Sequence, residues 1–327
     1  MTAKFNIALT DEAFYKDHYS EIEDFYQSLN FHQIKRDESN FLSALEFMPK
    51  DGRALKTLMI IPGRAEIEHK YAELIYSLKD LPLRILVLFV RGQGMSSPVI
   101  PGSHKCHIED FNLYRQDIEL MLDALEVTDF VQMGFSMGGL ISTDLAAHGR
   151  HKPQRLALMA PYLWPAYNLP APILRAFVGF MGSMPGLKTM YTPHGSEYKR
   201  LPFEENIHSH SRLRYERYHD YYAQHPELAL AGPSYCFVRQ SLLKQIELYN
   251  SHFEFTMPVF CAAAACDKVV SAAHCQSFME SHQHDVIKPK FVRVAGAYHD
   301  ILNEADEYRN PVMTRALNFL LNSAIQG

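Results

Sequence analysis

Short runs of hydrophobic residues recur along most of the chain, and longer segments with hydrophobic residues at every third or fourth position lie between them. The short runs predict β-strands at 32–36, 41–47, 55–61, 83–90, 129–134, 155–160, 257–266 and 288–296. The longer segments predict helices at 66–80, 109–125, 139–150 and 310–324. Because strands that are apolar throughout alternate with amphipathic helices, the pattern indicates an α/β fold, with a mostly parallel central sheet and helices on both faces.

Two segments depart from this rhythm. Residues 1–30 carry aromatic and aliphatic residues spaced as in a helix, and they predict a helical lead-in. Residues 161–255 are rich in Pro, Tyr, Met, Arg and His, with mainly helical patterning and no clear buried strand. We interpret this segment as a helical cap inserted between two parts of one α/β core, residues 1–160 and 256–327. It is expected above the carboxyl ends of the strands, where open α/β sheets bind their ligands.

A single serine, Ser136, lies between Gly134 and Gly138, where a predicted strand passes into a predicted helix. A turn this sharp brings neighbouring side chains together, so glycine is needed on both sides of the serine. The turn raises the Ser136 hydroxyl above the edge of the sheet and directs the N–H of Met137 toward any oxyanion formed there. The alternative is an ordinary glycine-rich helix start capped by a serine.

A serine nucleophile needs a base, and the base needs a carboxylate that holds its tautomer. In this fold the partners follow in the order serine, acid, histidine, each on a loop after a later strand. Asp267 directly follows the apolar strand 257–266, and His299 comes directly after the strand-like run 288–296. The remaining candidates, among them His282 at an expected solvated helix end, do not lie at such strand ends: Asp144, Asp285, Asp300, His274, His282 and His284. The sequence therefore predicts a triad of Ser136, Asp267 and His299.

A second oxyanion donor is expected from the loop that follows the predicted strand 55–61. Gly63 lets the backbone come close to the substrate, and the N–H of Arg64 is our candidate donor beside that of Met137. The alternative is a plain turn. That alternative is disfavoured because the predicted nucleophile, acid and base all follow strand ends in the order that the fold requires.

Composition narrows the class of protein. The 327 residues are 47% hydrophobic and 21% charged, an ordinary globular balance, and the net charge of −5 argues against a nucleic-acid partner. The first residues lack the apolar core of a signal peptide, and the longest apolar runs, 257–266 and 85–90, fall well short of a membrane span. We therefore expect a soluble, cytoplasmic protein that can still touch a membrane surface.

The five cysteines form an odd set without a C-x-x-C pair, so we interpret them as free thiols in a reducing compartment. His104, Cys106 and His107 lie close together in the sequence, but no second pair of ligands at a suitable spacing accompanies them. We interpret these three residues as part of a solvated loop, and no metal site is expected.

At these residues the sequence resembles the α/β-hydrolases of the monoacylglycerol lipase and lysophospholipase group, and more closely the bacterial lysophospholipase L2 family. The matching stretches are IPGRAEIEHKYAEL (61–74), RGQGMSSP (91–98), GFSMGG (134–139), AACDKVV (264–270), residues 296–320 and, within the predicted cap, residues 201–235. The resemblance places the nucleophile on Ser136, the acid on Asp267, the base on His299 and the oxyanion donors on the backbone of Met137 and Arg64. It implies hydrolysis of an ester of a single-chain lipid without a metal or organic cofactor.

One departure from the family pattern is clear. Where relatives have Asp before the x-R-G-x-G motif, this chain has Phe89. That Asp is taken to be structural, so we expect the change to bear on the stability of the following loop more than on catalysis. Residues 1–30 have no identifiable counterpart in the family.

The expected function is therefore that of a serine hydrolase that acts on a lipid ester, most simply a lysophospholipase that releases fatty acid through an acyl-enzyme on Ser136. A monoacylglycerol lipase or another carboxylesterase with the same triad is an alternative. A catalytically silent binding protein on the hydrolase scaffold is a remoter one, because fold alone does not fix function. The sequence predicts neither the head group, the chain length nor the oligomeric state.

Two features of the predicted cap leave their roles open. Residues 165–186 are apolar, which suits an acyl tunnel, a surface resting on a membrane or plain packing on the core. Arg212, Arg214 and Arg217 alternate with aromatic residues in a run that could meet a lipid phosphate, although a solvated helix face is the favoured interpretation.

Overall fold

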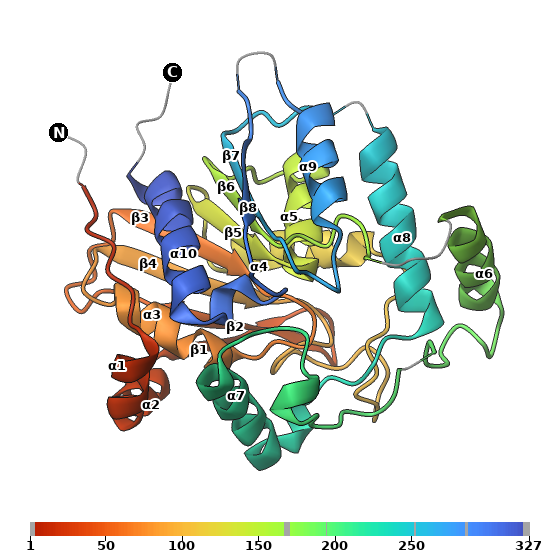
Figure 1. The fold of residues 1–327 in the computed structure, drawn as a ribbon. Coiled ribbons are helices and arrows are strands. Elements are labelled where there is room, and N and C mark those ends of the chain that lie inside the picture. The colour runs from red at the N-terminus through yellow and green to blue at the C-terminus, as the bar shows by residue number, and fades with distance from the viewer. Residues whose placement is uncertain (1–3, 167–170, 194, 252, 285–286, 323–327) are drawn as a thin grey trace.

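An eight-stranded sheet forms the centre of the molecule, with the strand order β1-β2-β4-β3-β5-β6-β7-β8 (Figure 1). The computed structural model describes residues 4–166, 171–193, 195–251, 253–284 and 287–322. The strands are β1 Asn30–Lys35, β2 Phe41–Phe47, β3 Lys56–Ile61, β4 Leu83–Phe89, β5 Val131–Phe135, β6 Leu156–Met159, β7 Val259–Ala264 and β8 Lys290–Val294. β2 is antiparallel to both β1 and β4, and the other neighbouring pairs are parallel. The predicted α/β fold with a mostly parallel sheet is confirmed.

Helices cover both faces of this sheet (Figure 1). They are α1 Glu12–Asp17, α2 Tyr19–Gln27, α3 Ala72–Leu78, α4 Asn112–Ala124, α5 Met137–His148, α6 Ala171–Ser183, α7 Arg212–Gln224, α8 Tyr235–Asn250, α9 Ala272–Ser281 and α10 Asp306–Leu321, with short 3₁₀ helices η1 Glu68–Tyr71, η2 Phe203–Glu205, η3 Pro226–Leu228 and η4 Ile301–Asn303. Successive side chains of a strand point to opposite faces. Leu86 and Leu88 of β4 accordingly belong to the hydrophobic cluster that includes side chains of α4, α5 and α9. Ile85 and Val87 belong to the cluster on the other face, which includes side chains of α2, α3 and α10.

Between β6 and β7 the described part of the chain forms α6, α7 and α8 and no named strand. α8 packs against α6 and against α5, whereas α7 packs against α1 and η1. Figure 1 accordingly shows α7 beside the first two helices and α6 at the far side of the molecule. The segment therefore holds two separately supported groups of helices.

The start of the described chain is tied to its last helix. The backbone N–H of Phe5 donates to Asn322 Oδ1 at 2.6 Å, and Asn322 Nδ2 donates back to the Phe5 carbonyl at 2.7 Å. The Glu12 N–H donates to Asp306 Oδ2 at the other end of α10, at 2.7 Å. α10 and the N-terminal segment thus cover one face of the sheet together.

The structure corrects the expectation for the arginines of α7. Arg214 is buried rather than solvated, with 2% of its side chain exposed. Its guanidinium donates to Glu73 and to Asp306, each at 2.8 Å, and to the Glu304 carbonyl at 2.7 Å. Arg212 is exposed as expected, and Arg217 lies over the Tyr19 ring at 3.7 Å. Arg214 therefore anchors α7 to the core and faces no lipid phosphate.

Two histidine predictions are also wrong. His282 is buried at the end of α9, where its ring nitrogens lie 3.0 Å from the Phe278 carbonyl and 2.9 Å from the Leu248 carbonyl. His107, expected in a solvated loop, is buried beside Ser234, with its Nδ1 2.9 Å from the serine hydroxyl. In each place one partner is distant in the sequence, Leu248 for His282 and Ser234 for His107, so local polarity gave no sign of burial.

Candidate active site

Ser136 stands on a strained turn between β5 and α5. Its backbone has φ 49° and ψ −115°, outside the regions that a residue with a side chain ordinarily adopts. A Cβ atom at position 138 would lie 2.0 Å from the Ile61 carbonyl oxygen, and one at position 134 would lie 2.2 Å from Ser142 Oγ. Only glycine fits either position, because α5 starts directly against the end of β3 and against β5. Such stored strain is typical of functional sites.

The structure brings the three predicted triad side chains together. His299 Nε2 lies 2.8 Å from Ser136 Oγ, and His299 Nδ1 lies 2.7 Å from Asp267 Oδ2. The other carboxylate oxygen of Asp267 accepts the backbone N–H groups of Val269 at 2.7 Å and Val270 at 2.9 Å. The loops after β5, β7 and β8 supply the three residues at the shared carboxyl edge of the parallel strands. The arrangement can pass a proton from the serine to the imidazole while the carboxylate fixes the ring.

The loop after β3 lies against the nucleophile. A Cβ atom at Gly63 would be 3.2 Å from the Cβ of Ser136 and 2.9 Å from the Phe135 ring, so the backbone approaches closely there. The N–H groups on either side of Arg64 are engaged: that of Gly63 donates to Glu66 Oε2 at 2.7 Å, and that of Ala65 donates to Gln93 Oε1 at 2.9 Å.

The two predicted oxyanion donors are available for a ligand. Within the described ranges, neither the Arg64 nor the Met137 backbone N–H donates to a protein acceptor. Arg64 lies on the loop that abuts Ser136, and Met137 is the first residue of α5. Unpaired N–H groups beside a nucleophile are the arrangement that stabilises a developing oxyanion.

Gln93, which the sequence did not single out, joins these two loops. Its side chain is buried in the loop after β4. While Oε1 accepts the Ala65 N–H, Nε2 lies 3.5 Å from the sulfur of Met137. The motif RGQGMSSP contains this glutamine, but only the folded chain shows which loops it meets.

The loop after β4 begins beyond Phe89, the position at which the sequence departs from the expected family pattern. Phe89 is buried in the core, and its carbonyl accepts the Ser96 hydroxyl at 2.7 Å. Arg91 pairs with Asp117 of α4, with donor–acceptor distances of 2.8 and 2.6 Å. These contacts tie the start of the loop to Ser96 and to α4.

Glu68 of η1 gives the same loop a second support. Its Oε1 accepts the Ser43 hydroxyl at 2.6 Å and the Met95 N–H at 3.0 Å. Among the described residues Oε2 has no hydrogen-bond partner. Burial raises the pKa of Glu68 above its usual range, although the hydrogen bonds from Met95 and Ser43 oppose this. The carboxyl group is thus easier to protonate than a solvated glutamate.

A buried ionic chain lies beside His299. Lys70 donates to Asp300 Oδ2 at 2.6 Å and also to Glu66, whose other oxygen accepts the Tyr71 hydroxyl at 2.5 Å. Burial alone would lower the pKa of Lys70, but the adjacent carboxylates of Asp300 and Glu66 outweigh it and raise that pKa. This series of ion pairs links the loop after β3 to Asp300, the residue that follows His299.

One further group of side chains has the donor types of a metal site. The ligand atoms of Asp144, His148 and Glu247 lie within 4.8 Å of one another. The Lys244 ammonium already lies among them, 3.1 Å from Asp144 Oδ1 and 2.8 Å from Glu247 Oε1, and Arg115 Nε is 3.0 Å from Asp144 Oδ2. These protein cations neutralise the carboxylates, so the group is an ion-pair link between α5 and α8.

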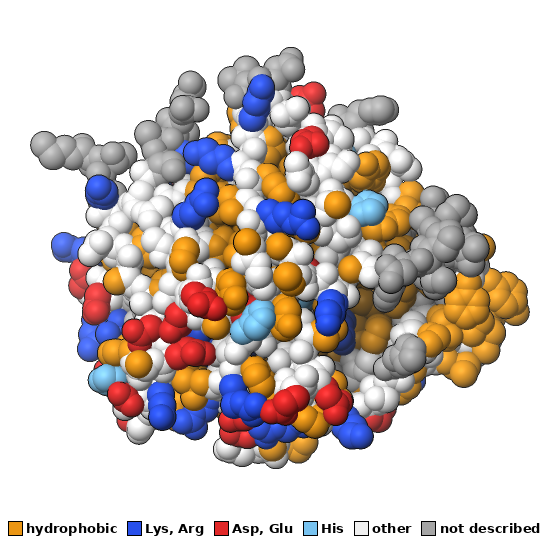
Figure 2. All heavy atoms as spheres, in the orientation of Figure 1, with side chains coloured by type: hydrophobic (Ala, Val, Ile, Leu, Met, Phe, Trp, Pro, Cys, Tyr) orange, Lys and Arg blue, Asp and Glu red, His pale blue; other side chains and the backbone are white. Residues whose placement is uncertain are grey.

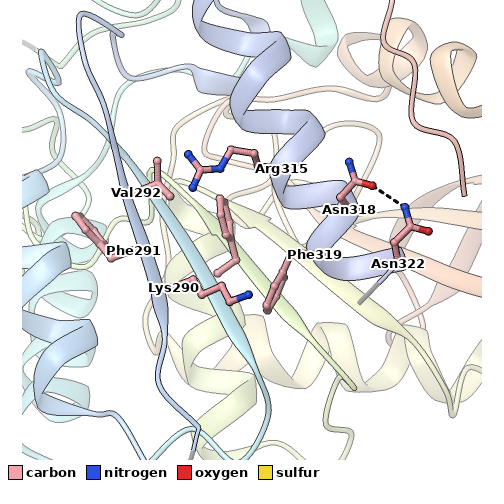
Figure 3. A pocket seen from close by; sticks show the side chains of 8 residues that line it. Lys290, Phe291, Val292, Arg315, Asn318, Phe319 and Asn322 are labelled. Atoms are coloured by element: carbon pink, nitrogen blue, oxygen red, sulfur yellow. Dashed lines mark hydrogen bonds between the residues drawn. The ribbon is translucent and has the colours of Figure 1, made fainter. Parts of the chain in front are cut away.

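A pocket of about 640 Å³ lies between β8 and α10, and no residue of the proposed triad lines it. Figure 3 shows the side chains that line this pocket. Its lining residues are Phe260, Lys290, Phe291, Val292, Arg315, Asn318, Phe319 and Asn322. None of them is a predicted site residue. β8 is one of the two edge strands of the sheet, and exposed Lys290 and Arg293 on it oppose pairing with another chain. We therefore interpret the basic side chains of β8 as protection of this sheet edge against pairing with a strand of another molecule.

Comparison with known proteins adds independent information. The model of the family described as serine aminopeptidase, S33, matches residues 52–306. Lysophospholipase L2 of Escherichia coli (strain K12) is 29% identical over 276 residues, which cover 81% of this chain and 80% of that protein. A probable lysophospholipase L2 of Haemophilus influenzae is 23% identical over 271 residues, which cover 82% of this chain and 84% of that protein.

Solved structures share the fold. A soluble variant of monoglyceride lipase from Saccharomyces cerevisiae, in complex with a substrate analog, superposes with a TM-score of 0.69 at 16% identity. The superposition covers 89% of this chain and 94% of the lipase. At that identity the similarity establishes the fold alone, and the reaction has to be inferred from the residues of the site.

Proposed function

The chain belongs to the α/β-hydrolase family described as serine aminopeptidase, S33, and from this premise we propose that it is a lysophospholipase. The coarser class, a carboxylic ester hydrolase of the lysophospholipase and monoacylglycerol lipase group, agrees with the sequence prediction. The observation that carries the reaction class, ester hydrolysis by a serine nucleophile, is the hydrogen-bonded series Asp267–His299–Ser136, with Ser136 on the turn between β5 and α5. The relatives named lysophospholipase L2 support a lysophospholipid as the substrate.

The proposed reaction is a two-step acyl transfer. Ser136 Oγ attacks the ester carbonyl carbon while its proton passes to His299 Nε2, and the N–H groups of Arg64 and Met137 stabilise the oxyanion. The glycerol oxygen leaves with the proton from His299, so the acyl group stays on Ser136. Water then gives a proton to His299 and attacks the acyl carbon, which releases the fatty acid and returns the proton to the serine. Asp267 orients the imidazole and stabilises its charged form.

We further propose that residues 161–255 form a cap over a core made of residues 1–160 and 256–327. Two contacts near the triad support this. The His208 carbonyl accepts the N–H of Asp300, next to His299, at 2.8 Å. Tyr222 of α7 donates to the Ala65 carbonyl, next to Arg64, at 2.8 Å. A segment that meets both loops of the site is well placed to select the substrate.

The same segment offers an apolar surface for peripheral membrane contact. Phe177 and Phe180 of α6 are 48% and 59% exposed, and Figure 2 shows hydrophobic side chains gathered at this side of the molecule. No helix within the described ranges has the length and apolar composition to cross a bilayer. An enzyme that takes its substrate from a membrane gains from such a surface, since buried apolar side chains favour binding at the interface.

A vesicle sedimentation assay tests the membrane contact. Replacing Phe177 and Phe180 by serine should lower the fraction bound to phosphatidylcholine–phosphatidylglycerol vesicles several-fold, because two large apolar side chains no longer enter the interface. Leu55→Ser is the matched control, since Leu55 is 61% exposed in the turn before β3. Equal binding of the α6 variant and the control would remove the proposal.

Fatty acid release decides the substrate. A lysophosphatidylcholine and a monoacylglycerol of equal chain length are compared, with Ser136→Ala as the blank. Faster turnover of the lysophospholipid is expected. Faster hydrolysis of the monoacylglycerol would leave the proposed acyl transfer unchanged, but it would identify the enzyme as a monoacylglycerol lipase instead of a lysophospholipase. Reaction of Ser136 with a fluorophosphonate separates both outcomes from a silent binding protein, which would not be labelled.

A further inference from the structure

Ala65 has an unusual backbone conformation for a residue with a side chain. Its φ is 60°, in the left-handed region that glycine favours, and it directly follows Arg64. A peptide unit in this region persists only where its surroundings hold it. The orientation of the Arg64–Ala65 segment therefore depends on the groups that contact Ala65.

Both polar atoms of the Ala65 backbone are held by side chains from other parts of the chain. The N–H donates to Gln93 Oε1 at 2.9 Å. The carbonyl oxygen accepts the Tyr222 hydroxyl at 2.8 Å, and the Tyr218 hydroxyl also lies within hydrogen-bonding distance of it. The two hydroxyl oxygens are 2.9 Å apart, so Tyr218 can donate to Ala65 or to Tyr222.

The two tyrosines keep their protons over the working range of pH. Burial raises the pKa of both Tyr218 and Tyr222 well above the ordinary value. Both hydroxyls therefore remain hydrogen-bond donors. A donor that never ionises is suited to fixing a carbonyl oxygen and unsuited to acid–base work.

α7, which carries both tyrosines, is anchored to the core by contacts along its length. Arg214 is bound to Glu73 and Asp306, and the Tyr221 ring stacks on His69 with centroids 3.9 Å apart. Ser211, at the start of the helix, donates to Glu12 of α1. Tyr218 and Tyr222 thus reach the Ala65 carbonyl from a rigid support.

We propose that Tyr218 and Tyr222 are positioning residues of the oxyanion hole. They hold Ala65 in its left-handed conformation and so direct the Arg64 N–H toward the substrate oxygen. This inference rests on the proposed ester hydrolysis for its kinetic consequence, whereas its structural consequence is independent of the reaction. Neither tyrosine touches the reacting atoms.

Phenylalanine substitutions test the role of the hydroxyls, because they leave the rings in place. The double variant Tyr218→Phe, Tyr222→Phe should lower kcat about tenfold with KM within about twofold of the parent, less than the 10²- to 10³-fold loss for removal of a direct oxyanion donor. Tyr198→Phe is the matched control: its ring packs on Tyr222, but its hydroxyl bonds His219 instead of Ala65. An unchanged kcat in the double variant, or an equal loss in the control, would overturn the proposal.

A rescue experiment separates positioning from simple packing. Glycine adopts positive φ freely. Ala65→Gly added to the double tyrosine variant should therefore restore several-fold of the lost kcat. A merely structural role of the tyrosines in holding α7 predicts no rescue, and that result would count against the proposal.

Amide hydrogen exchange gives a readout that needs no substrate. The peptide covering residues 62–67 should exchange about tenfold faster in the double variant than in the parent, and at the parental rate in Tyr198→Phe. If the exchange rate of this peptide were the same in the double variant and the parent, the positioning role of Tyr218 and Tyr222 would be overturned, whatever substrate the enzyme hydrolyses. A parent protein that hydrolyses no ester would instead refute the proposed function, while exchange still decides the role of the tyrosines.

Discussion

Gln93 Oε1 accepts the backbone N–H of Ala65 at 2.9 Å, from a loop that is 28 positions further along the chain. Through its other end the same side chain meets Met137. One buried amide thus connects both segments that carry the proposed oxyanion donors. The site is assembled from loops that support one another, and replacement of individual supports separates their roles.

Gln93→Leu should lower kcat about tenfold and leave KM within about twofold, because the leucine cannot hold the Ala65 N–H and the Arg64 donor shifts. Steady-state kinetics on a soluble short-chain ester measure both constants. Gln276→Leu on the exposed face of α9 is the control, since its amide donates to Glu280 of the same helix at 2.9 Å. An equal effect in both variants would show that Gln93 acts through general stability.

Asp267→Asn should reduce kcat about 10³- to 10⁴-fold while the fold is kept, since an amide cannot hold the His299 tautomer that accepts the serine proton. Far-ultraviolet circular dichroism confirms folding, and substrate hydrolysis measures the loss. Asp80→Asn, at a side chain that is 90% exposed, should change nothing. Retention of a tenth of the parental kcat by Asp267→Asn would rule out the triad as proposed.

Gly138→Ala should destabilise the turn that carries Ser136. The new Cβ atom would lie 2.0 Å from the Ile61 carbonyl oxygen, so α5 must move away from the end of β3. We expect a lower melting temperature together with loss of fluorophosphonate labelling. Gly179→Ala, where a Cβ atom meets nothing within 4 Å, is the matched glycine replacement. It should keep labelling and stabilise α6 slightly.

Arg214→Met should lower the free energy of unfolding by about 3 kcal/mol, because it leaves the buried Glu73 carboxylate with weaker compensation. The value lies at the low end for buried pairs, since Arg309 remains 3.6 Å from Glu73. Arg212→Met, two positions away and half-exposed, should cost at most about 1 kcal/mol. Urea denaturation measures both, and similar values would contradict the assigned burial.

Glu68→Gln should change how stability depends on pH. Because burial raises the pKa of Glu68 above 4.5, the protonated group favours the folded state, and this contribution is lost as the pH rises through the folded pKa. The glutamine variant does not ionise. Its unfolding free energy relative to the parent should therefore improve as the pH increases above 4.5, by about 1.4 kcal/mol per pH unit until the pH reaches the folded pKa. A constant difference from pH 4 to pH 8 would mean that the pKa is not raised.

The positions of the proposed triad residues could be predicted because each follows a predicted strand. Ser136 directly follows β5, whereas Asp267 and His299 lie on the loops after β7 and β8, and parallel strands end at one edge. The direction of a strand is harder to predict, since a hydrophobic run has the same pattern in either direction. The antiparallel placement of β2 between β1 and β4 was accordingly visible only in the fold.

Burial of polar side chains could not be predicted from the sequence. Arg212 and Arg214 differ by two positions on one helix, and the partners that bury Arg214 come from α3 and α10. Tyr218 and Tyr222 are four positions apart, so a shared helix face is predictable. That this face meets the Ala65 carbonyl depends on the packing of α7 against distant segments, which no local pattern encodes.

The pair of hydrogen bonds between Phe5 and Asn322 spans 317 positions, so it forms only after everything between them has been synthesised. Until then α10 cannot cover its face of the sheet, and the apolar side chains of β5, β6 and β7 on that face stay open to water. A nascent chain in this state is prone to aggregation and is a natural substrate for chaperones. Contacts of such long range also favour slow folding. The burial of this face is therefore completed by the last helix of the described chain, together with the segment around Phe5.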